Sequence, residues 1–196
     1  YVDEKTNEIK FIDNSLKAPD SLLQRAYSDI AYENTANDIR VALPKKIQQG
    51  VAVEADGYTL TMTPVTDQNP NAVKKEVAFA DQEETMVEYS NAFGQHSHVQ
   101  YKPVSKGVKE NILLDEYTGV NEFQFIIDAQ GLVPNADEGC VIEFYDEKTS
   151  ESVFRINKAW AMDSFQDTNS DEFVNEDEIN IVSEAASEGS DGTMNS

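Results

Sequence analysis

Residues 51–63 have the sequence Val-Ala-Val-Glu-Ala-Asp-Gly-Tyr-Thr-Leu-Thr-Met-Thr. Hydrophobic side chains occupy alternate positions on both sides of Asp56-Gly57, and this alternation is typical of strands with one buried face. An Asp-Gly pair between two alternating runs indicates a tight hairpin, because glycine tolerates the positive φ that the turn requires. The stretch therefore predicts two consecutive antiparallel strands.

The same period-two pattern recurs along most of the chain. It is found at residues 8–13, 38–43, 77–79, 86–89, 99–101, 108–114, 122–127, 141–145, 152–156 and 179–181. Residues 146–151 separate two of these runs and predict a hairpin loop. About a dozen short strands at this spacing favour a sandwich or barrel. We predict an all-β fold, an antiparallel β-sandwich of about a dozen short strands, with at most one short helix near residues 19–27.

The domain organisation follows from length and composition. A chain of 196 residues fits one large or two small domains. We expect residues 1–183 to form one β-sandwich module, or two sub-modules that divide near residues 81–106. Residues 184–196 are rich in Ser, Glu, Ala and Gly and predict a flexible acidic tail. Because the sequence begins at Tyr1 rather than Met, we expect it to be cut from a longer protein.

Charge excludes several classes of function. The chain has 37 Asp and Glu residues against 15 Lys and Arg, a net charge of −22. A surface this acidic repels phosphate backbones, so we expect no nucleic-acid partner.

No hydrophobic run approaches the roughly 18 residues that span a bilayer, so we expect no membrane insertion. The single cysteine, Cys140, rules out an internal disulfide, and we expect it to be buried as a small apolar residue.

One acidic stretch has the spacing of a calcium-binding loop. Asp167, Asn169, Asp171, the Phe173 carbonyl and Glu178 occupy positions 1, 3, 5, 7 and 12 of such a loop. Glu172 stands where the loop normally needs glycine. The alternative is a solvated acidic connection, and calcium is the one cofactor that we consider.

The only two histidines, His96 and His98, are two residues apart. If both lay on one strand, their rings would share a face and could reach one metal ion. The alternative is a pair of half-exposed polar positions beside the strand that contains Tyr101.

We predict no catalytic residues. We expect most aromatic side chains to lie in the core, whereas an exposed aromatic row would indicate sugar stacking.

Several segments taken together resemble a known family. They are residues 8–16, 32–39, 56–60, 87–94, 99–101, 107–114, 123–125, 154–156 and 162–163. Their order resembles the N-terminal β domain that precedes the YD-repeat (Rhs-type) region of large secreted, wall-associated proteins of Gram-positive bacteria. Residues 107–114, Gly-Val-Lys-Glu-Asn-Ile-Leu-Leu, are the most specific of them. Residues 17–31 and the loop at 167–178 depart from the pattern.

The resemblance implies an extracellular, non-catalytic structural or adhesive module of a large bacterial surface protein. Its partner would be a surface protein or a polysaccharide, and the isolated piece is expected to be a monomer. The alternative is a carbohydrate-binding β-sandwich with a possible need for calcium. A third class, a glycosidase or metal-dependent hydrolase, would require polar groups that converge in a pocket.

Overall fold

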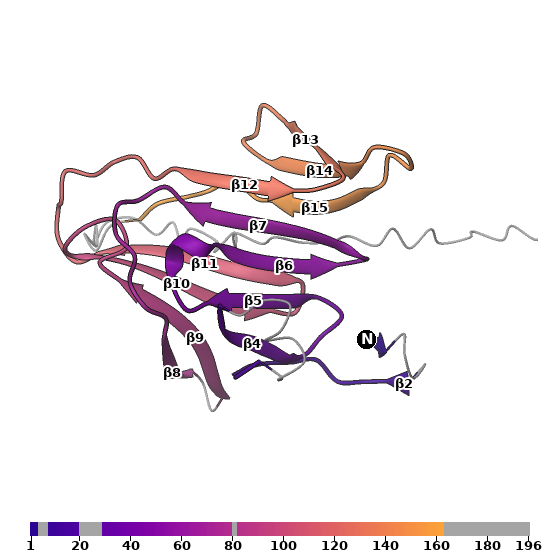
Figure 1. Ribbon diagram of the computed structural model, residues 1–196, viewed down its shortest axis with the longest axis horizontal. Helices are drawn as coiled ribbons and strands as arrows, with labels where there is room; N and C mark the ends of the chain where they lie inside the picture. Colours follow the sequence, from indigo (N-terminus) through magenta and orange to yellow (C-terminus); the bar gives the residue numbers. More distant parts are fainter. Residues whose placement is uncertain (4–7, 20–28, 80–81, 163–196) are drawn as a thin grey trace, which may run out of the picture.

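The computed structural model describes residues 1–3, 8–19, 29–79 and 82–162. These residues form an all-β structure of antiparallel sheets, which confirms the predicted fold class. The described part contains one helical element, the short 3-10 turn η1 (Ile47–Gln49), and no α-helix. Figure 1 shows the strands arranged in layers, with β5 (Arg40–Pro44), β6 (Val51–Ala55) and β7 (Tyr58–Pro64) in front of β10 (Ser97–Val104) and β11 (Gly107–Leu114).

The largest sheet has six strands in the order β12-β7-β6-β5-β4-β3. Sequential neighbours pair from β3 to β7, and β12 then joins the free edge of β7 from a distant part of the chain. Its strands are β3 (Asp13–Lys17), β4 (Ile30–Ala36), β5 (Arg40–Pro44), β6 (Val51–Ala55), β7 (Tyr58–Pro64) and β12 (Phe125–Ala129).

A second sheet has four strands in the order β11-β10-β9-β8, and a third has three in the order β13-β14-β15. Two short strands, β1 (Val2–Asp3) and β2 (Glu8–Ile9), pair separately. The remaining strands are β8 (Val73–Phe79), β9 (Gln82–Ser90), β10 (Ser97–Val104), β11 (Gly107–Leu114), β13 (Leu132–Ala136), β14 (Ile142–Asp146) and β15 (Ser152–Ile156).

The hairpin predicted at residues 51–63 is present as β6 and β7. Asp56 and Gly57 form its turn with φ angles of 51° and 79°, the positive values that a two-residue turn requires. Val53 pairs with Leu60, and both side chains point into the core. The alternating hydrophobic residues therefore face inward, and Thr59 and Thr61 lie on the outer face of the sheet.

One hydrophobic core joins the three larger sheets. The six-stranded and four-stranded sheets contribute inward-facing residues at alternate positions, and Phe144, Val153 and Phe154 of the three-stranded sheet belong to the same cluster. Because burial of apolar area is the main favourable contribution to folding, this shared core stabilises the layers as one body. Its largest fully buried side chains are Tyr89, Tyr101, Phe154, Leu43, Ile47, Leu60, Val41, Val51, Val53, Val87, Val99 and Val108.

Polar and aromatic contacts also connect the layers. The backbone N–H of Leu16 in β3 donates a 2.9 Å hydrogen bond to Thr85 Oγ1 in β9. At one end of the sandwich, Phe93 makes edge-on contacts with Phe123 and Phe125, with ring centroids 4.9 and 5.9 Å apart. These aromatic contacts attach the turn after β9 to the segment that leads into β12.

Three strands lie where the sequence pattern predicts none, namely the two-residue β1, β4 and β13. In β4 the side chains of Glu33 and Asn34 are both buried, which hides the alternation. Asn34 is satisfied by hydrogen bonds to the Val41 N–H and the Ile39 carbonyl. In β13, Pro134 occupies an edge strand, where a missing N–H donor is tolerated.

Other local predictions differ from the structure. Of the strand predicted at residues 8–13, only β2 and the first residue of β3 are strand, and residues 10–12 are not. β12 starts at Phe125 rather than at residue 122. The prediction that Cys140 is buried is wrong, because it lies exposed in the turn before β14 with φ at 63°. The helix predicted near residues 19–27 lies almost wholly outside the described residues, and Pro19 is not helical. No helix of the described part is long and apolar enough to cross a membrane.

Candidate functional site

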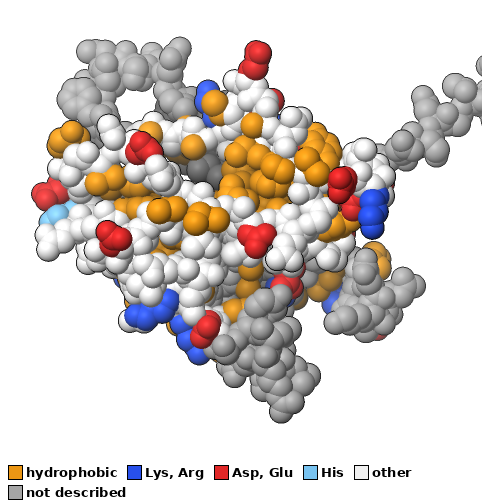
Figure 2. Space-filling view, turned by 45° about the horizontal axis from the view of Figure 1, so that its top comes forward, with side chains coloured by type: hydrophobic (Ala, Val, Ile, Leu, Met, Phe, Trp, Pro, Cys, Tyr) orange, Lys and Arg blue, Asp and Glu red, His pale blue; other side chains and the backbone are white. Residues whose placement is uncertain are grey.

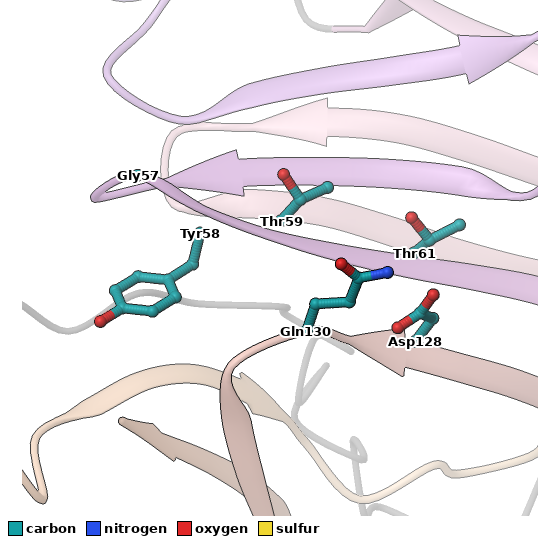
Figure 3. A pocket seen from close by; sticks show the side chains of 6 residues that line it. All are labelled: Gly57, Tyr58, Thr59, Thr61, Asp128 and Gln130. Atoms are coloured by element: carbon teal, nitrogen blue, oxygen red, sulfur yellow. The ribbon is translucent and has the colours of Figure 1, made fainter. Parts of the chain in front are cut away.

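A polar hollow of about 390 Å³ opens on the outer face of the six-stranded sheet. It is lined by residues from the β6–β7 turn, from β7 and from the end of β12, and we name it the β7–β12 hollow. Figure 3 shows Thr59 and Thr61 on β7, with Asp128 on the neighbouring strand β12 and Gln130 just after the end of that strand. The lining residues are Gly57, Tyr58, Thr59, Thr61, Asp128 and Gln130.

The antiparallel register of β7 and β12 brings these side chains together. Thr61 pairs directly with Asp128, and Leu60 pairs with Ala129. The register ends at this pair, and Gln130 lies in the turn directly after β12. Since successive residues of a strand alternate between faces, the buried Leu60 and Met62 fix Thr59 and Thr61 on the outside. The cross-strand pair Thr61–Asp128 thus borders the hollow together with Thr59 and Gln130.

The polar groups of the hollow are open to solvent. Asp128 and Gln130 are exposed, and Thr59 and Thr61 are partly exposed. Within the described residues, no hydrogen bond engages any of these four side chains. They therefore present two hydroxyl groups, one amide and one carboxylate that are available to a ligand.

Tyr58 belongs to the hollow but has a separate polar partner. Its phenol donates a hydrogen bond to the Asp146 carboxylate at the end of β14, and its ring points away from the threonines in Figure 3. This hydrogen bond, together with those from the backbone N–H groups of Thr149 and Lys148, lowers the pKa of Asp146 to about 2. Tyr58 thus links the six-stranded sheet to the three-stranded sheet beside the hollow.

An ion-pair row on the same outer face leads up to the hollow. Arg40 Nε lies 3.0 Å from Glu33 Oε2, and Arg40 Nη1 lies 2.9 Å from Glu54 Oε1. Lys17 Nζ lies 3.8 Å from the other oxygen of Glu33. Glu54 in turn pairs in register with Thr59. Two carboxylates, those of Glu33 and Glu54, pair with Arg40 and compensate its positive charge within this row.

The side chains of the two histidines contact different carboxylates. His96 precedes β10 in a turn with φ at 64°, and its Nε2 lies 3.3 Å from Glu116 Oε1. His98 is in β10, with Nε2 at 2.9 Å from Asp115 Oδ2 and Nδ1 at 3.8 Å from Glu88 Oε1. The two rings therefore do not project from one strand face toward a common point.

Glu88 is the centre of a polar cluster on the outer face of the four-stranded sheet. Burial alone would raise its pKa, but hydrogen bonds from Gln100 and Ser90, with the nearby positive charge of Lys75, lower it below the usual value. Both carboxylate oxygens of Glu88 are therefore engaged by neighbouring side chains.

Metal-binding candidates have no further support in the described part of the chain. Residues 1–3, 8–19, 29–79 and 82–162 contain no group of three or more His, Cys, Asp or Glu side chains placed to hold a metal ion. The predicted calcium ligands lie outside these residues, so that site stays a prediction. They are Asp167, Asn169, Asp171, Phe173 and Glu178.

The molecule also has an apolar area near the hollow. Figure 2 shows hydrophobic side chains that gather around β12 and the three-stranded sheet, with acidic side chains between them. Ile126, 62% exposed, precedes Asp128 by two residues and so lies on the same outer face of β12. Of the aromatic side chains, Phe11 and Tyr117 are strongly exposed, but they come from distant segments and do not form a row.

The sequence analysis predicts no site at the hollow, although it indicates the direction of two of the lining side chains. The alternation at residues 58–63 predicts that Thr59 and Thr61 face outward. Nothing in the sequence pairs them with Asp128 and Gln130, since the pairing of β7 with β12 joins positions far apart in the chain. No family model, no curated protein and no solved structure matches this chain.

Proposed function

We propose that this chain is a non-catalytic structural and adhesive module of a large extracellular protein, at the cell surface of a Gram-positive bacterium. The observation that carries the proposal is the continuous core that joins the three larger sheets. A module that displays a binding face must hold its shape without a partner, and a shared core provides that rigidity. The resemblance to the β domain of YD-repeat proteins supports the same context.

Charge and surface chemistry agree with this role. A net charge of −22 keeps such modules apart from one another in solution. The outer face of the six-stranded sheet offers unengaged hydroxyl, amide and carboxylate groups in the β7–β12 hollow. Asp128 is the one carboxylate among the described lining residues, whereas glycoside cleavage normally uses a pair of carboxyl groups. These features favour binding over turnover.

The test uses the complete 196-residue chain. Fluorescently labelled protein is incubated with isolated Gram-positive cell walls, and bound protein is measured together with any sugar or peptide fragments released. We expect saturable retention and no released fragments. Retention no greater than that of an unrelated protein of similar acidity would refute the adhesive role, and release of wall fragments would identify an enzyme instead.

A further inference from the structure

We propose that the β7–β12 hollow binds a neutral saccharide. The inference rests on the proposed adhesive function and deepens it by naming the ligand class and the residues that contact it. It is carried by the geometry of the outer sheet face, where the cross-strand pair Thr61–Asp128 and the side chains of Thr59 and Gln130 border one open depression.

The hydrogen-bonding groups match a ring that carries several hydroxyls. Each sugar hydroxyl can donate one hydrogen bond and accept others. The Asp128 carboxylate accepts, the Gln130 amide both donates and accepts, and the hydroxyl groups of Thr59 and Thr61 can do either. Since these side chains have no partner in the described structure, a saccharide would not have to displace an existing protein contact.

The charge around the hollow selects against anionic ligands. Asp128 lies in it, Glu54 pairs with Thr59 at its border, and Asp146 accepts the hydrogen bond of Tyr58. No Lys or Arg is among the described lining residues. Glu54 is paired with Arg40, but Asp128 has no cation beside it in the lining, so a uronate, a phosphate or a teichoic acid would meet an uncompensated carboxylate and a neutral sugar is the better fit.

The hollow has sufficient size, and an apolar side chain lies outside its lining on the same face. Ile126 is exposed two residues before Asp128 on β12, where it can cover the C–H side of a sugar ring that extends past the hollow. A volume of about 390 Å³ is at the lower end of the range that holds small organic ligands. Because it lies open on a sheet face, a chain of sugar units could extend beyond it in either direction.

The strands hold the binding groups in place before any ligand arrives. Thr59 and Thr61 stand on the central hairpin, whose inner side contributes the fully buried Val53 and Leu60. Asp128 is fixed opposite Thr61 by the register of β12. Side chains on rigid strands lose less freedom on binding than side chains on a loop, which favours affinity.

The test measures binding of defined oligosaccharides to the full chain by NMR, with backbone amide shifts as the readout. The probes are cellotetraose, maltotetraose, mannotetraose and N-acetylchitotetraose, with tetragalacturonate as the anionic comparison. We expect at least one neutral probe to shift the amides of β7 and β12 in a saturable manner. We expect tetragalacturonate to leave them unchanged.

Matched variants assign the effect to the hollow. The double substitution Asp128→Ala with Gln130→Ala removes two binding groups, and we expect it to weaken binding at least tenfold. The control, Asp67→Ala with Gln95→Ala, removes the same two residue types from exposed positions elsewhere and should leave the dissociation constant unchanged. Thermal melts of both variants check that each is folded.

Three results would overturn the inference: no neutral probe shifts these amides, the anionic probe binds at least as well, or the double variant binds like the control. If one of these results is found while the unmodified chain is still retained on cell walls, only the saccharide site is refuted. If the unmodified chain is not retained on cell walls, the proposed function itself is refuted. The two failures are therefore distinguishable.

Discussion

The phenol of Tyr89 on β9 donates a 2.6 Å hydrogen bond to the carbonyl oxygen of Pro44 at the end of β5, and this bond crosses the interior of the sandwich. Tyr89 is fully buried, and its ring meets that of Tyr101 edge-on at a centroid distance of 6.1 Å. Burial raises the pKa of Tyr89 far above its usual value, so the phenol stays a donor at any ordinary pH. The two sheets are thus held together by a polar contact as well as by apolar packing.

Tyr89→Phe keeps the ring and removes the hydrogen bond, so we expect a loss of about 1–3 kcal/mol of unfolding free energy. The loss arises because the buried Pro44 carbonyl is left without its donor. Urea unfolding measures it. Tyr117→Phe is the matched control, since Tyr117 is 92% exposed and should change stability by less than about 0.5 kcal/mol. Equal effects for the two variants would contradict this role of Tyr89.

Gly50→Ala should destabilise the fold severely. Gly50 has φ at 81° and ψ at 145°, a region that is nearly restricted to glycine. An added Cβ would collide with Thr63 Oγ1 and lie 2.7 Å from Thr61 Cγ2 on the neighbouring strand. We expect a loss of more than about 3 kcal/mol, because the clash adds to the backbone strain.

Gly119→Ala separates these two causes. Gly119 has a similar φ of 78°, but nothing lies within 4 Å of the position its Cβ would take. We expect about 1–2 kcal/mol from strain alone. If chemical denaturation gives the same loss for both variants, the collision at Gly50 contributes nothing.

The parts of the fold that could be predicted from sequence are those fixed by local rules. The Asp56-Gly57 turn and the alternation around it predict the β6–β7 hairpin, and β15 occupies the residues where its alternation predicts it. The alternation of hydrophobic residues does not predict β4, because Glu33 and Asn34 are buried polar residues and Glu33 is paired with Arg40. Their burial depends on partners from other segments, so hydropathy alone could not indicate it.

The candidate site shows the same limit. Alternation predicts the outward direction of Thr59 and Thr61, because direction on a strand is a local property. Their meeting with Asp128 depends on β12 joining the edge of β7. The register between two distant strands is set by packing over the whole core, so it cannot be predicted from local patterns in a single sequence. Similarly, exposure of Cys140 follows from its place in a turn with positive φ.

Tyr58→Phe should raise the pKa of Asp146. The hydrogen bond from the Tyr58 phenol is the largest cause of its low pKa of about 2, followed by hydrogen bonds from the backbone of Thr149 and Lys148. Without the phenol, the pKa should move toward the usual value near 3.8. A carboxyl NMR titration measures the change.

The consequence for stability follows from the sign of that shift. A lowered pKa in the folded state contributes stability above about pH 4 and loses it as the pH falls toward 2. The variant should therefore show a weaker loss of stability over that interval. Tyr145→Phe is the control, because its phenol donates to Glu143 instead. A pKa of Asp146 that is the same in all three proteins would rule out the Tyr58 contact.

Glu110→Gln should stabilise the chain at neutral and alkaline pH. Glu110 lies on β11, an edge strand, opposite the fully buried Tyr101, and its Oε2 is buried without a hydrogen-bond partner among the described residues. Burial raises its pKa from 4.5 to about 7. The folded chain therefore holds a proton at pH 6 that the unfolded chain releases.

Because the folded state binds the extra proton between about pH 4.5 and 7, the stability contributed by Glu110 is complete below that interval and falls as the pH rises through it. Replacement by the neutral Gln removes this dependence. We expect the variant to equal the unmodified chain near pH 4 and to exceed it by on the order of 1–3 kcal/mol at pH 8. Urea unfolding at both pH values measures the difference. Glu138→Gln removes one exposed negative charge and serves as the control. A gain at pH 8 that is as large for Glu138→Gln would show that relief of net charge, rather than burial of Glu110, causes it.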